Sequence, residues 1–252
     1  MNFWVRIRPA LFIIALLGVW HVGAASQKTH LLPTPFETAA GIVELLQRGL
    51  LIKYIVASLF RVTWGFVGAA VIAIPLGLAI GWYRRAEMAI NPLVQILRPI
   101  SPLAWIPISI LWFGVGDIAA IYLIFLASFL PLVVTGINAV GSIPQVYINA
   151  GRNFGLSSTS VVYRVLYPAV VPQLIIGLRI TLGIAWLVVV AAEMIAVNSG
   201  LGFLIVDARN AGNRYDLVVA GMVMIGIIGL VLDTGMRSLE KARSLRWGYS
   251  ED

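Results

Sequence analysis

Residues 148–168 read INAGRNFGLSSTSVVYRVLYP and lie between two long apolar runs, at 118–140 and 172–197. The whole segment between those runs, 141–171, is polar, yet it does not resemble a flexible linker. Gly155 divides it into two stretches, and prolines stand towards both of its ends. A helix–Gly–helix unit held outside a membrane is typical of a docking element, while a re-entrant or surface hairpin without a partner is the alternative.

Two short helices are predicted in this segment, at 148–154 and 157–166. Ser157 or Ser158 is expected to cap the second helix, because a serine oxygen can accept a hydrogen bond from a free N–H of the first turn. Gly155 lies between the helices and is expected to adopt a positive φ or to allow a close approach of another segment.

The composition of the chain indicates an integral membrane protein. Of its 252 residues, 60% are hydrophobic and 12% are charged, and the mean hydropathy is +0.94. A soluble domain is about 45–50% apolar and about 25% charged, which argues against a soluble enzyme and against a disordered chain. The chain has no Cys and two His, so it offers no disulfide and no cysteine metal site. The net charge of +7 is assigned to cytoplasmic loops rather than to nucleic-acid binding.

Six apolar runs are long enough to cross a bilayer as helices, which takes roughly 20 residues each. The runs do not alternate in polarity, as strands of a membrane barrel would. Pro168 and Pro172 are expected to fix the direction in which the chain enters the fifth run. The runs are 8–25, 54–82, 90–113, 118–140, 172–197 and 216–236.

The loop charges orient the chain with both termini in the cytoplasm. In that arrangement ten Lys and Arg residues lie in internal segments and five in external ones, which follows the positive-inside rule. The first run also resembles a signal peptide, because Arg6 and Arg8 precede it and small residues at 23–26 follow it. A retained first helix is the preferred interpretation.

The first external segment, 26–53, is predicted to contain an amphipathic helix that lies on the outer membrane face. It covers 36–48 and follows an extended Pro-rich stretch. Thr34 is its expected cap, and Glu37 completes the pattern of a capping box.

Three features inside the apolar runs have simple structural interpretations. Arg61 is expected in the outer headgroup layer, and Asp233 is expected to pair with Arg237, four residues later on the same helix. Gly77 and Gly81 form a small-xxx-small face, which predicts close packing against another helix.

The polar segment also carries a family motif. Its Asn149-Ala150-Gly151, followed by Gly155 and Pro168, resembles the EAA loop of the inner-membrane permease subunits of binding-protein-dependent ABC importers. That loop reads Glu-Ala-Ala-x-x-x-Gly and ends in an apolar-x-x-Pro. Gly155 and Pro168 fall at the family spacing and Ala150 matches the first Ala. Asn149 stands where the family often has Glu, and Gly151 where it has Ala.

Further stretches resemble the branch of this family that handles nitrate, aliphatic sulfonates, taurine and related small anions. The similarity extends from about Leu31 to Arg237. Members with these motifs also carry thiamine-precursor-like and bicarbonate substrates, so the motifs do not identify the solute. The stretches are RPISPLAWIP at 98–107, WFGVG at 112–116, GLRI at 177–180, AAEM at 191–194 and SGLG at 199–202.

The resemblance implies an all-α, type I ABC importer permease fold: one transmembrane domain over 1–252, with about six membrane helices, in a bacterial-type inner membrane. It implies a homodimer with the solute path on its axis, and a solute-binding protein that delivers cargo to an external face including 198–215. It also implies a separate ATP-binding subunit that holds ATP and Mg, so this chain is not an enzyme and binds no cofactor, metal or nucleic acid. The coupling helix, at 148–158, would dock on that subunit. The expected coupling residues are Asn149, Ala150, Gly151, Arg152, Asn153, Phe154, Gly155, Leu156 and Ser157.

Charged residues inside the runs are candidates for the solute path or its gate. Glu193 lies in the outer half of the fifth run, where an ionisable group normally faces a cavity or a partner. A structural hydrogen bond to the backbone or to Asn198 is the alternative. Arg98 and Arg179 lie toward the inner ends of their runs and could attract an anion. Snorkelling toward lipid headgroups, or pairing on the ATPase side, is the alternative for both.

Ser101 and Trp105 complete the path candidates. Together with Ser109 and Trp112 they are expected to share one face of the third run, and a polar and aromatic face can line a path. A packing stripe with interfacial Trp residues is the alternative.

Two other functional classes remain open on the residues alone. An intramembrane aspartyl protease would use the GVGD of 114–117 and the YD of 215–216, and would need both carboxylates side by side. A secondary transporter or channel would not need a docking segment, and it often shows inverted repeats, of which the sequence has no convincing example. The sequence has no Gly-x-x-x-x-Gly-Lys-Ser/Thr run, so ATP must be bound by another chain if the transport is ATP-driven.

Overall fold

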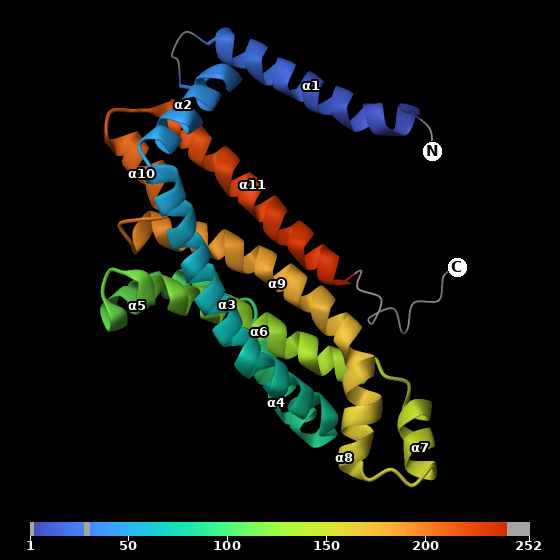
Figure 1. The fold of residues 1–252 in the computed structure, drawn as a ribbon. Coiled ribbons are helices and arrows are strands. Elements are labelled where there is room, and N and C mark those ends of the chain that lie inside the picture. Colours follow the sequence, from blue (N-terminus) through green and yellow to red (C-terminus); the bar gives the residue numbers. More distant parts are fainter. Residues whose placement is uncertain (1–2, 28–30, 241–252) are drawn as a thin grey trace.

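The computed structural model describes residues 3–27 and 31–240, and all the regular secondary structure in this part of the chain is helical (Figure 1). The elements in chain order are α1 Phe3–Ala25, α2 Pro35–Gln47, α3 Leu50–Trp82, α4 Arg84–Leu97, η1 Pro102–Trp105, α5 Ile106–Phe113, α6 Asp117–Gly141, α7 Gln145–Asn153, α8 Ser158–Val161, the π-turn η2 Val162–Leu166, α9 Tyr167–Ile195, α10 Leu201–Asn210 and α11 Tyr215–Glu240.

The membrane-spanning elements agree with the predicted all-α architecture. Within the described residues, four helical stretches are long and apolar enough to cross a bilayer, and a fifth consists of two helices with a bend between them. A shorter apolar helix, Leu11–Ala25, forms most of α1. The four are Leu50–Trp82, Asp117–Gly141, Ser158–Ile195 and Tyr215–Glu240.

The third run was expected to be one helix over 90–113, and that expectation is wrong. The chain bends by 77° between α4 and the η1–α5 pair. Pro99 and Pro102 have no N–H to donate to the preceding turn, so a regular helix cannot continue through this stretch. Ser101 is extended instead, and its hydroxyl accepts a hydrogen bond from the N–H of Leu103 at 3.3 Å, which starts a new helical turn.

Pro168 and Pro172, which were expected to fix the direction in which the chain enters the fifth run, lie inside a helical stretch that begins earlier than predicted. Helix α8, the π-turn and α9 form one stretch, Ser158–Ile195. In the π-turn the N–H of Tyr167 donates to the carbonyl of Val162, five residues back. This wide turn directly precedes Pro168, which lacks an N–H, and wide turns of this kind let a helix continue past such a defect.

Helices α3 and α6 form the most extensive helix–helix contact of the described chain. Gly77 makes it possible, because a Cβ at this position would lie 2.4 Å from the carbonyl oxygen of Val133. A Cβ at Gly81 would lie 3.0 Å from the Cα of Ile137. The predicted small-residue packing face at Gly77 and Gly81 is therefore confirmed.

Helix α2 is confirmed in its cap and its position along the chain. The hydroxyl of Thr34 accepts from the N–H of Glu37, and the Glu37 carboxylate accepts from the N–H of Thr34 at 2.7 Å, as in a capping box. Its apolar residues Phe36 and Val43 are exposed. The Phe36 ring meets the His21 ring of α1 edge-on, and its remaining surface is open, as it would be on a membrane face.

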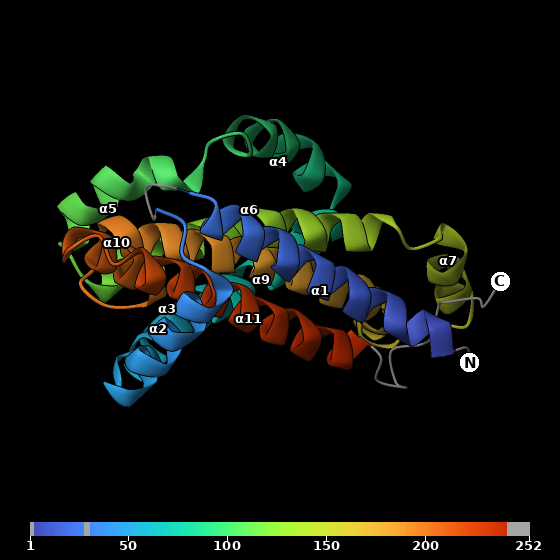
Figure 2. The same cartoon turned by 90° about the horizontal axis from the view of Figure 1, so that it is seen from above.

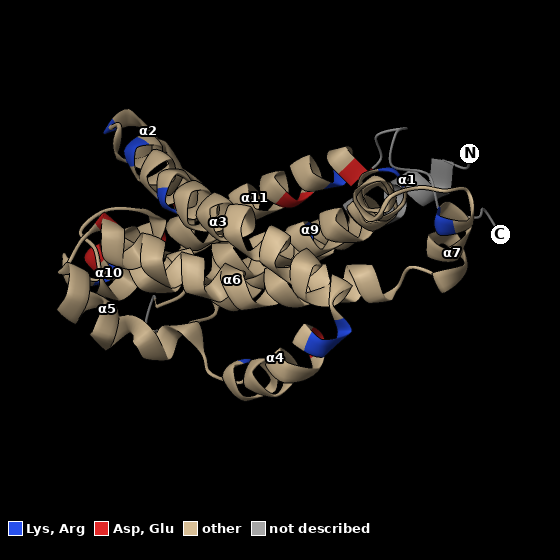
Figure 3. Cartoon of the chain, turned by 90° about the horizontal axis from the view of Figure 1, so that it is seen from below, with Lys and Arg blue, Asp and Glu red and all other residues tan. Residues whose placement is uncertain are grey.

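Different helices and chain ends gather at the two ends of the molecule. The start of α1, the end of α11 and the α7 hairpin lie at one end, whereas α5 and α10 lie at the other (Figure 2). Both described chain ends are therefore on the side of the 141–171 segment, as the loop charges predict. Charged residues are sparse along the spanning helices (Figure 3).

Candidate functional site

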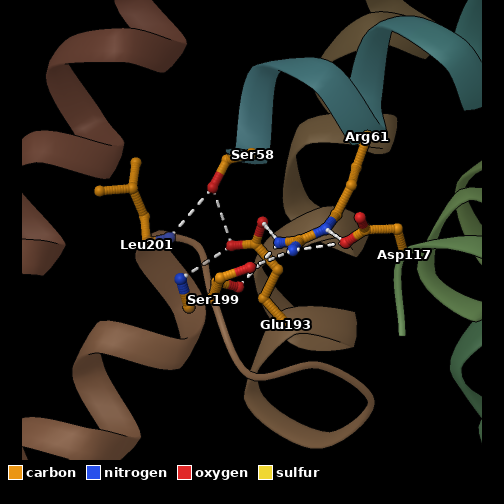
Figure 4. Close-up of polar contacts among 7 residues, drawn as sticks. Ser58, Arg61, Asp117, Glu193, Ser199 and Leu201 are labelled. Atoms are coloured by element: carbon orange, nitrogen blue, oxygen red, sulfur yellow. Dashed lines mark hydrogen bonds and ion pairs between the residues drawn. The ribbon is translucent and has the colours of Figure 1, made fainter. Parts of the chain in front are cut away.

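A buried ion pair joins α3 and α9 near the end of the molecule that carries α5 and α10. Arg61 is 2% exposed and Glu193 is 0% exposed, and Nη1 of Arg61 lies 2.7 Å from Oε1 of Glu193 (Figure 4). Removing two charges from water costs on the order of several kcal/mol each, unless further hydrogen bonds satisfy both groups. The partners of each group therefore decide what the pair does.

Glu193 caps helix α10. Its Oε2 accepts hydrogen bonds from the Ser58 hydroxyl and from the N–H of Gly202, both at 2.9 Å. The same hydroxyl accepts from the N–H of Leu201 at 3.0 Å. The first two N–H groups of α10 are thus satisfied by side chains of α3 and α9, and a carboxylate at a helix N-terminus is favourable.

Arg61 connects this cap to the start of α6. Its Nε donates to Oδ1 of Asp117 at 2.8 Å, and Nη1 donates to the carbonyl of Ser199 at 2.7 Å. Its Nη2 reaches both the hydroxyl of Ser199 and the carboxylate of Asp117. Every nitrogen of the guanidinium is therefore occupied. We call Ser58, Arg61, Asp117, Glu193 and Ser199 the outer cluster.

Two glycines make room for the outer cluster. Gly200 has φ +108°, and a Cβ there would lie 2.3 Å from the Glu193 carboxylate. A Cβ at Gly202 would lie 2.2 Å from the carbonyl oxygen of Val190. Both glycines of the Ser-Gly-Leu-Gly stretch are therefore needed, because any side chain at either position would clash with its neighbours.

The contacts of the outer cluster bear on the expectations for Arg61 and for Glu193. Arg61 does not lie in a headgroup layer, because it is buried and bound to two carboxylates. For Glu193 the structural alternative describes the contacts, since it accepts a backbone hydrogen bond from Gly202. Its other partners are Ser58 and Arg61 rather than Asn198, which is exposed. The sequence signal for this pair was that Arg61 and Glu193, with opposite charges, both lie in the outer halves of apolar runs.

Arg179 is neutralised by acidic residues of α11. Its Nε lies 2.6 Å from Asp233, and its Nη1 lies 3.2 Å from Glu240. Asp233 also pairs with Arg237 at 3.4 Å, which confirms the predicted pair. The side chain of Arg179 is 25% exposed, so two carboxylates compete with any anion that would reach it.

A third ionic group lies at the α2 end of α11. Arg214 binds Glu44 of α2 at 2.6 Å and Asp216 at 2.7 Å. The hydrogen bond from Arg214 holds the pKa of the Glu44 carboxyl below its usual range. Asp117 and Asp216 thus each bind a different arginine instead of each other. The paired carboxylates of an aspartyl protease are not formed.

The bend in the third run separates the remaining path candidates. Arg98 is exposed at the end of α4, and Ser101 caps η1. Trp105 is half-buried against the apolar core at the α5 end of the bundle, and Ser109 is buried and donates to the carbonyl of Ile106. The four residues Ser101, Trp105, Ser109 and Trp112 therefore do not share one helix face.

The hairpin at the other end of the molecule consists of α7, the turn at Gly155 and α8. Gly155 has φ +76°, which confirms the predicted positive φ, and Ser157 caps α8 by accepting from the N–H of Ser160. Phe154 is 88% exposed at the tip. The expected coupling residues divide by burial: Gly151 is buried, Ala150 and Leu156 are half-buried, and Asn149, Arg152, Asn153, Phe154, Gly155 and Ser157 are exposed.

An apolar cluster fixes the hairpin to the spanning helices. Ile148 of α7 and Val161 of α8 share one buried cluster with Val140 of α6 and Val170 of α9. Trp82 at the end of α3 packs against the same cluster. A displacement of the hairpin would therefore be transmitted to three helices through close-packed side chains.

The sequence of the chain matches a known family of transport proteins, which distinguishes an ABC importer permease from a secondary transporter or channel. Residues 73–244 match the model of the binding-protein-dependent transport system inner membrane component, which covers more than half of the chain. The chain belongs to this family. It is a multi-pass inner-membrane permease of an ABC importer and not the ATPase.

Individual relatives agree with this assignment. The permease is 37% identical to the nitrate import permease protein NrtB of Synechocystis over 93% of this chain and 88% of that one. It is 34% identical to the taurine transport system permease protein TauC of Escherichia coli over 91% and 86%. It thus belongs to the nitrate, taurine and sulfonate branch.

Solved structures show the same fold. A chain of the inward-facing MetNI methionine ABC transporter superposes with a TM-score of 0.67 at 21% identity, over 78% of this permease and 97% of that chain. A chain of a bacterial alginate ABC transporter superposes with a TM-score of 0.64 at 16% identity, over 98% and 99%.

Proposed function

We propose that two copies of this permease form the path of an ATP-driven importer for a small oxyanion such as nitrate, a sulfonate such as taurine, or bicarbonate. The cytoplasmic hairpin is the coupling helix that docks on a separate ATP-binding subunit. A solute-binding protein delivers the cargo to the end that carries α5 and α10. The observation that carries the proposal is the exposed Phe154 on a hairpin that is otherwise anchored by a buried core.

The surface of the hairpin supports a protein partner. Phe154, Tyr147 and Val146 are exposed, although the polar segment around them lies outside the spanning helices. Large apolar side chains that cluster on such a surface mark an interaction site. Asn149 replaces the common Glu of the family motif, so contact with the ATPase would depend more on the shape of the hairpin and on Phe154.

The hairpin core supports transmission of the ATPase movement. ATP binding and hydrolysis change the spacing of the ATP-binding subunits, and a rigid element seated on them moves with them. Ile148 and Val161 connect the hairpin to α6 and α9, and Trp82 connects it to α3. The ATPase movement would therefore reach the walls of the path without passing through a flexible linker.

Cargo and assembly are inferred from the branch and from the charges. Relatives are named for nitrate and taurine, which are small molecules with planar or tetrahedral oxyanion groups. The buried Glu193 is paired with Arg61, and Asp233 is paired with Arg179, so neither presents an isolated negative charge to an anion. About six helices enclose no wide path alone, so the path is placed between two copies.

Co-purification tests the docking role of the hairpin. The intact chain is extracted from native membranes in mild detergent, and mass spectrometry identifies what accompanies it. Phe154→Asp is expected to lose the ATP-binding subunit, because a charge would be buried in the contact. Phe36→Asp is the matched control, since Phe36 is also exposed but lies on α2.

The control variant should retain the ATPase at the wild-type level. Equal retention by Phe154→Asp would refute the hairpin as the docking element. A wild-type chain that purifies without any ATPase would refute the importer assignment itself.

A further inference from the structure

The broken third span places Arg98 within the depth of the bundle. Helix α4 begins beside the inner end of α3 (Figure 1), and Ile90 packs against a buried cluster that includes Ala73 of α3 and Val133 of α6. Helix α5 then continues to the outer turn, where the N–H of Gly116 donates to the carbonyl of Ala196 at 2.9 Å. The break between α4 and η1 therefore lies between the two ends of the membrane span.

Helix α4 has three distinct faces. Val94 is buried, Ile90 is half-buried against the bundle, and Leu97 on the same side of the helix is also half-buried. A second, exposed face is apolar and carries Leu93 and Ile96. The third face is polar and exposed. It carries Asn91, Gln95 and Arg98, which recur at the spacing of one side of a helix.

Arg98 differs from the other arginines of the span region in its partners. Arg61, Arg179 and Arg214 each bind two carboxylates. No carboxylate among the described residues lies within ion-pair distance of Arg98. A cation at membrane depth is expensive unless it faces water or finds an anion.

We propose that Asn91, Gln95 and Arg98 line the solute path, and that the Arg98 guanidinium binds the cargo oxyanion as it passes the break. This inference rests on the proposed function and assigns its binding residue. A guanidinium offers a planar set of N–H donors that matches two oxygens of a nitrate or sulfonate group. The amides of Asn91 and Gln95 supply further donors along the same face.

A phospholipid phosphate presents the same oxyanion chemistry to Arg98. If Arg98 bound a lipid phosphate, the polar face would point to the lipid. Asn91, Gln95 and Arg98 would then be no more accessible to water than the neighbouring Leu93 and Ile96. The path assignment predicts a different pattern, with water on the polar face and none on the apolar face. Accessibility therefore separates the two sources.

Single cysteines measure that accessibility directly, because the chain contains no Cys of its own. Asn91→Cys, Gln95→Cys and Arg98→Cys are introduced one at a time and assembled with the ATPase in liposomes. We expect each to react with a negatively charged, membrane-impermeant methanethiosulfonate, whereas Leu93→Cys and Ile96→Cys do not. Unreactive polar positions, or equal labelling of all five, would overturn the inference.

Uptake by the complete complex measures the binding role. Arg98→Gln is expected to lower the transport efficiency (kcat/KM) for nitrate or taurine by about 10- to 100-fold, as loss of a charged hydrogen bond implies. Arg98→Lys should recover part of it because it restores the charge. Arg85→Gln is the control, since Arg85 is exposed near the start of the same helix but on another side of it, and should leave uptake unchanged.

The outcomes distinguish this inference from the proposed function. If the wild-type complex takes up neither anion, the cargo class is wrong and the role of Arg98 falls with it. If the wild type takes up an anion and Arg98→Gln matches it, the role of Arg98 alone is refuted. A defect that appears only in liposomes rich in anionic lipid would assign Arg98 to a lipid phosphate and also refute it.

Discussion

The outer cluster and the hairpin of α7 and α8 hold their ends of the permease together by opposite means. At the outer end, Arg61 and Glu193 are buried and all their polar groups are used within the chain. At the inner end, the hairpin is held by apolar contacts and leaves Phe154 exposed. The saturated Arg61–Glu193 pair has nothing left to offer a partner, whereas an exposed apolar tip does.

This difference separates stability from coupling. The partners of the outer cluster belong to α3, α6 and α9 and to the turn before α10, so the cluster fixes helix ends relative to each other. The tip of the hairpin contributes little to the core, because Phe154 contacts mostly solvent. Variants of the outer cluster should therefore change the melting temperature, and variants of the tip should change transport.

The largest expected effect comes from Arg61→Met. Glu193 would remain fully buried without its counter-charge, which costs about 3–5 kcal/mol in comparable buried pairs. Thermal unfolding of the purified permease in detergent measures the loss. The double variant Arg61→Met/Glu193→Leu is expected to be more stable than Arg61→Met, because it removes the stranded charge as well.

Arg48→Met is the matched control for that experiment. Arg48 also pairs with a glutamate, Glu44, at 2.6 Å, but its side chain is 59% exposed. An exposed pair contributes about 0–1 kcal/mol, so the control should unfold close to the wild type. If Arg61→Met unfolded at the same temperature as this control, the outer cluster would not stabilise the fold.

A smaller effect on stability, but a loss of transport, is expected for Gly155→Pro. Proline fixes φ near −65°, whereas Gly155 has φ +76°, and proline also removes the N–H that donates to the carbonyl of Arg152 at 2.9 Å. The local cost exceeds about 1 kcal/mol but stays in the hairpin. Hydrolysis and uptake are measured together on the reconstituted complex.

We expect Gly155→Pro to hydrolyse ATP without moving cargo, while the permease remains in the membrane. Gly155→Asn is the matched control, because Asn tolerates a positive φ better than other residues with a side chain. Normal cargo-stimulated uptake by the proline variant would contradict the coupling role of the hairpin.

Local patterns predicted the parts of this molecule that depend on neighbouring residues. The capping box at Thr34, the turn at Gly155 and the cap at Ser157 each involve residues within a few positions of each other. The bend of the third run also had a local signal, in Pro99 and Pro102, which the high hydropathy of the run outweighed.

The outer cluster could not be predicted in the same way. Arg61 and Glu193 are 132 positions apart, and nothing local indicates that α3 and α9 bring them together. Burial of an arginine becomes favourable only when the fold supplies several partners at once. Gly200 and Gly202 indicated that another group packs closely against this turn, but the sequence did not identify that group as the Glu193 carboxylate.

Gly200→Ala tests the packing around the outer cluster and sharpens the comparison. The new Cβ would lie 2.3 Å from the Glu193 carboxylate, and the alanine would have to adopt a positive φ. Gly114→Ala separates these two costs, because Gly114 has φ +74° but a Cβ added there would have no atom within 4 Å. Both variants carry the backbone strain of about 1–3 kcal/mol, and only Gly200→Ala also displaces the carboxylate. Thermal unfolding should therefore place Gly200→Ala below Gly114→Ala, with coupling retained in both. Equal melting temperatures would show that the outer cluster yields to a methyl group, and its role as a rigid junction would be refuted.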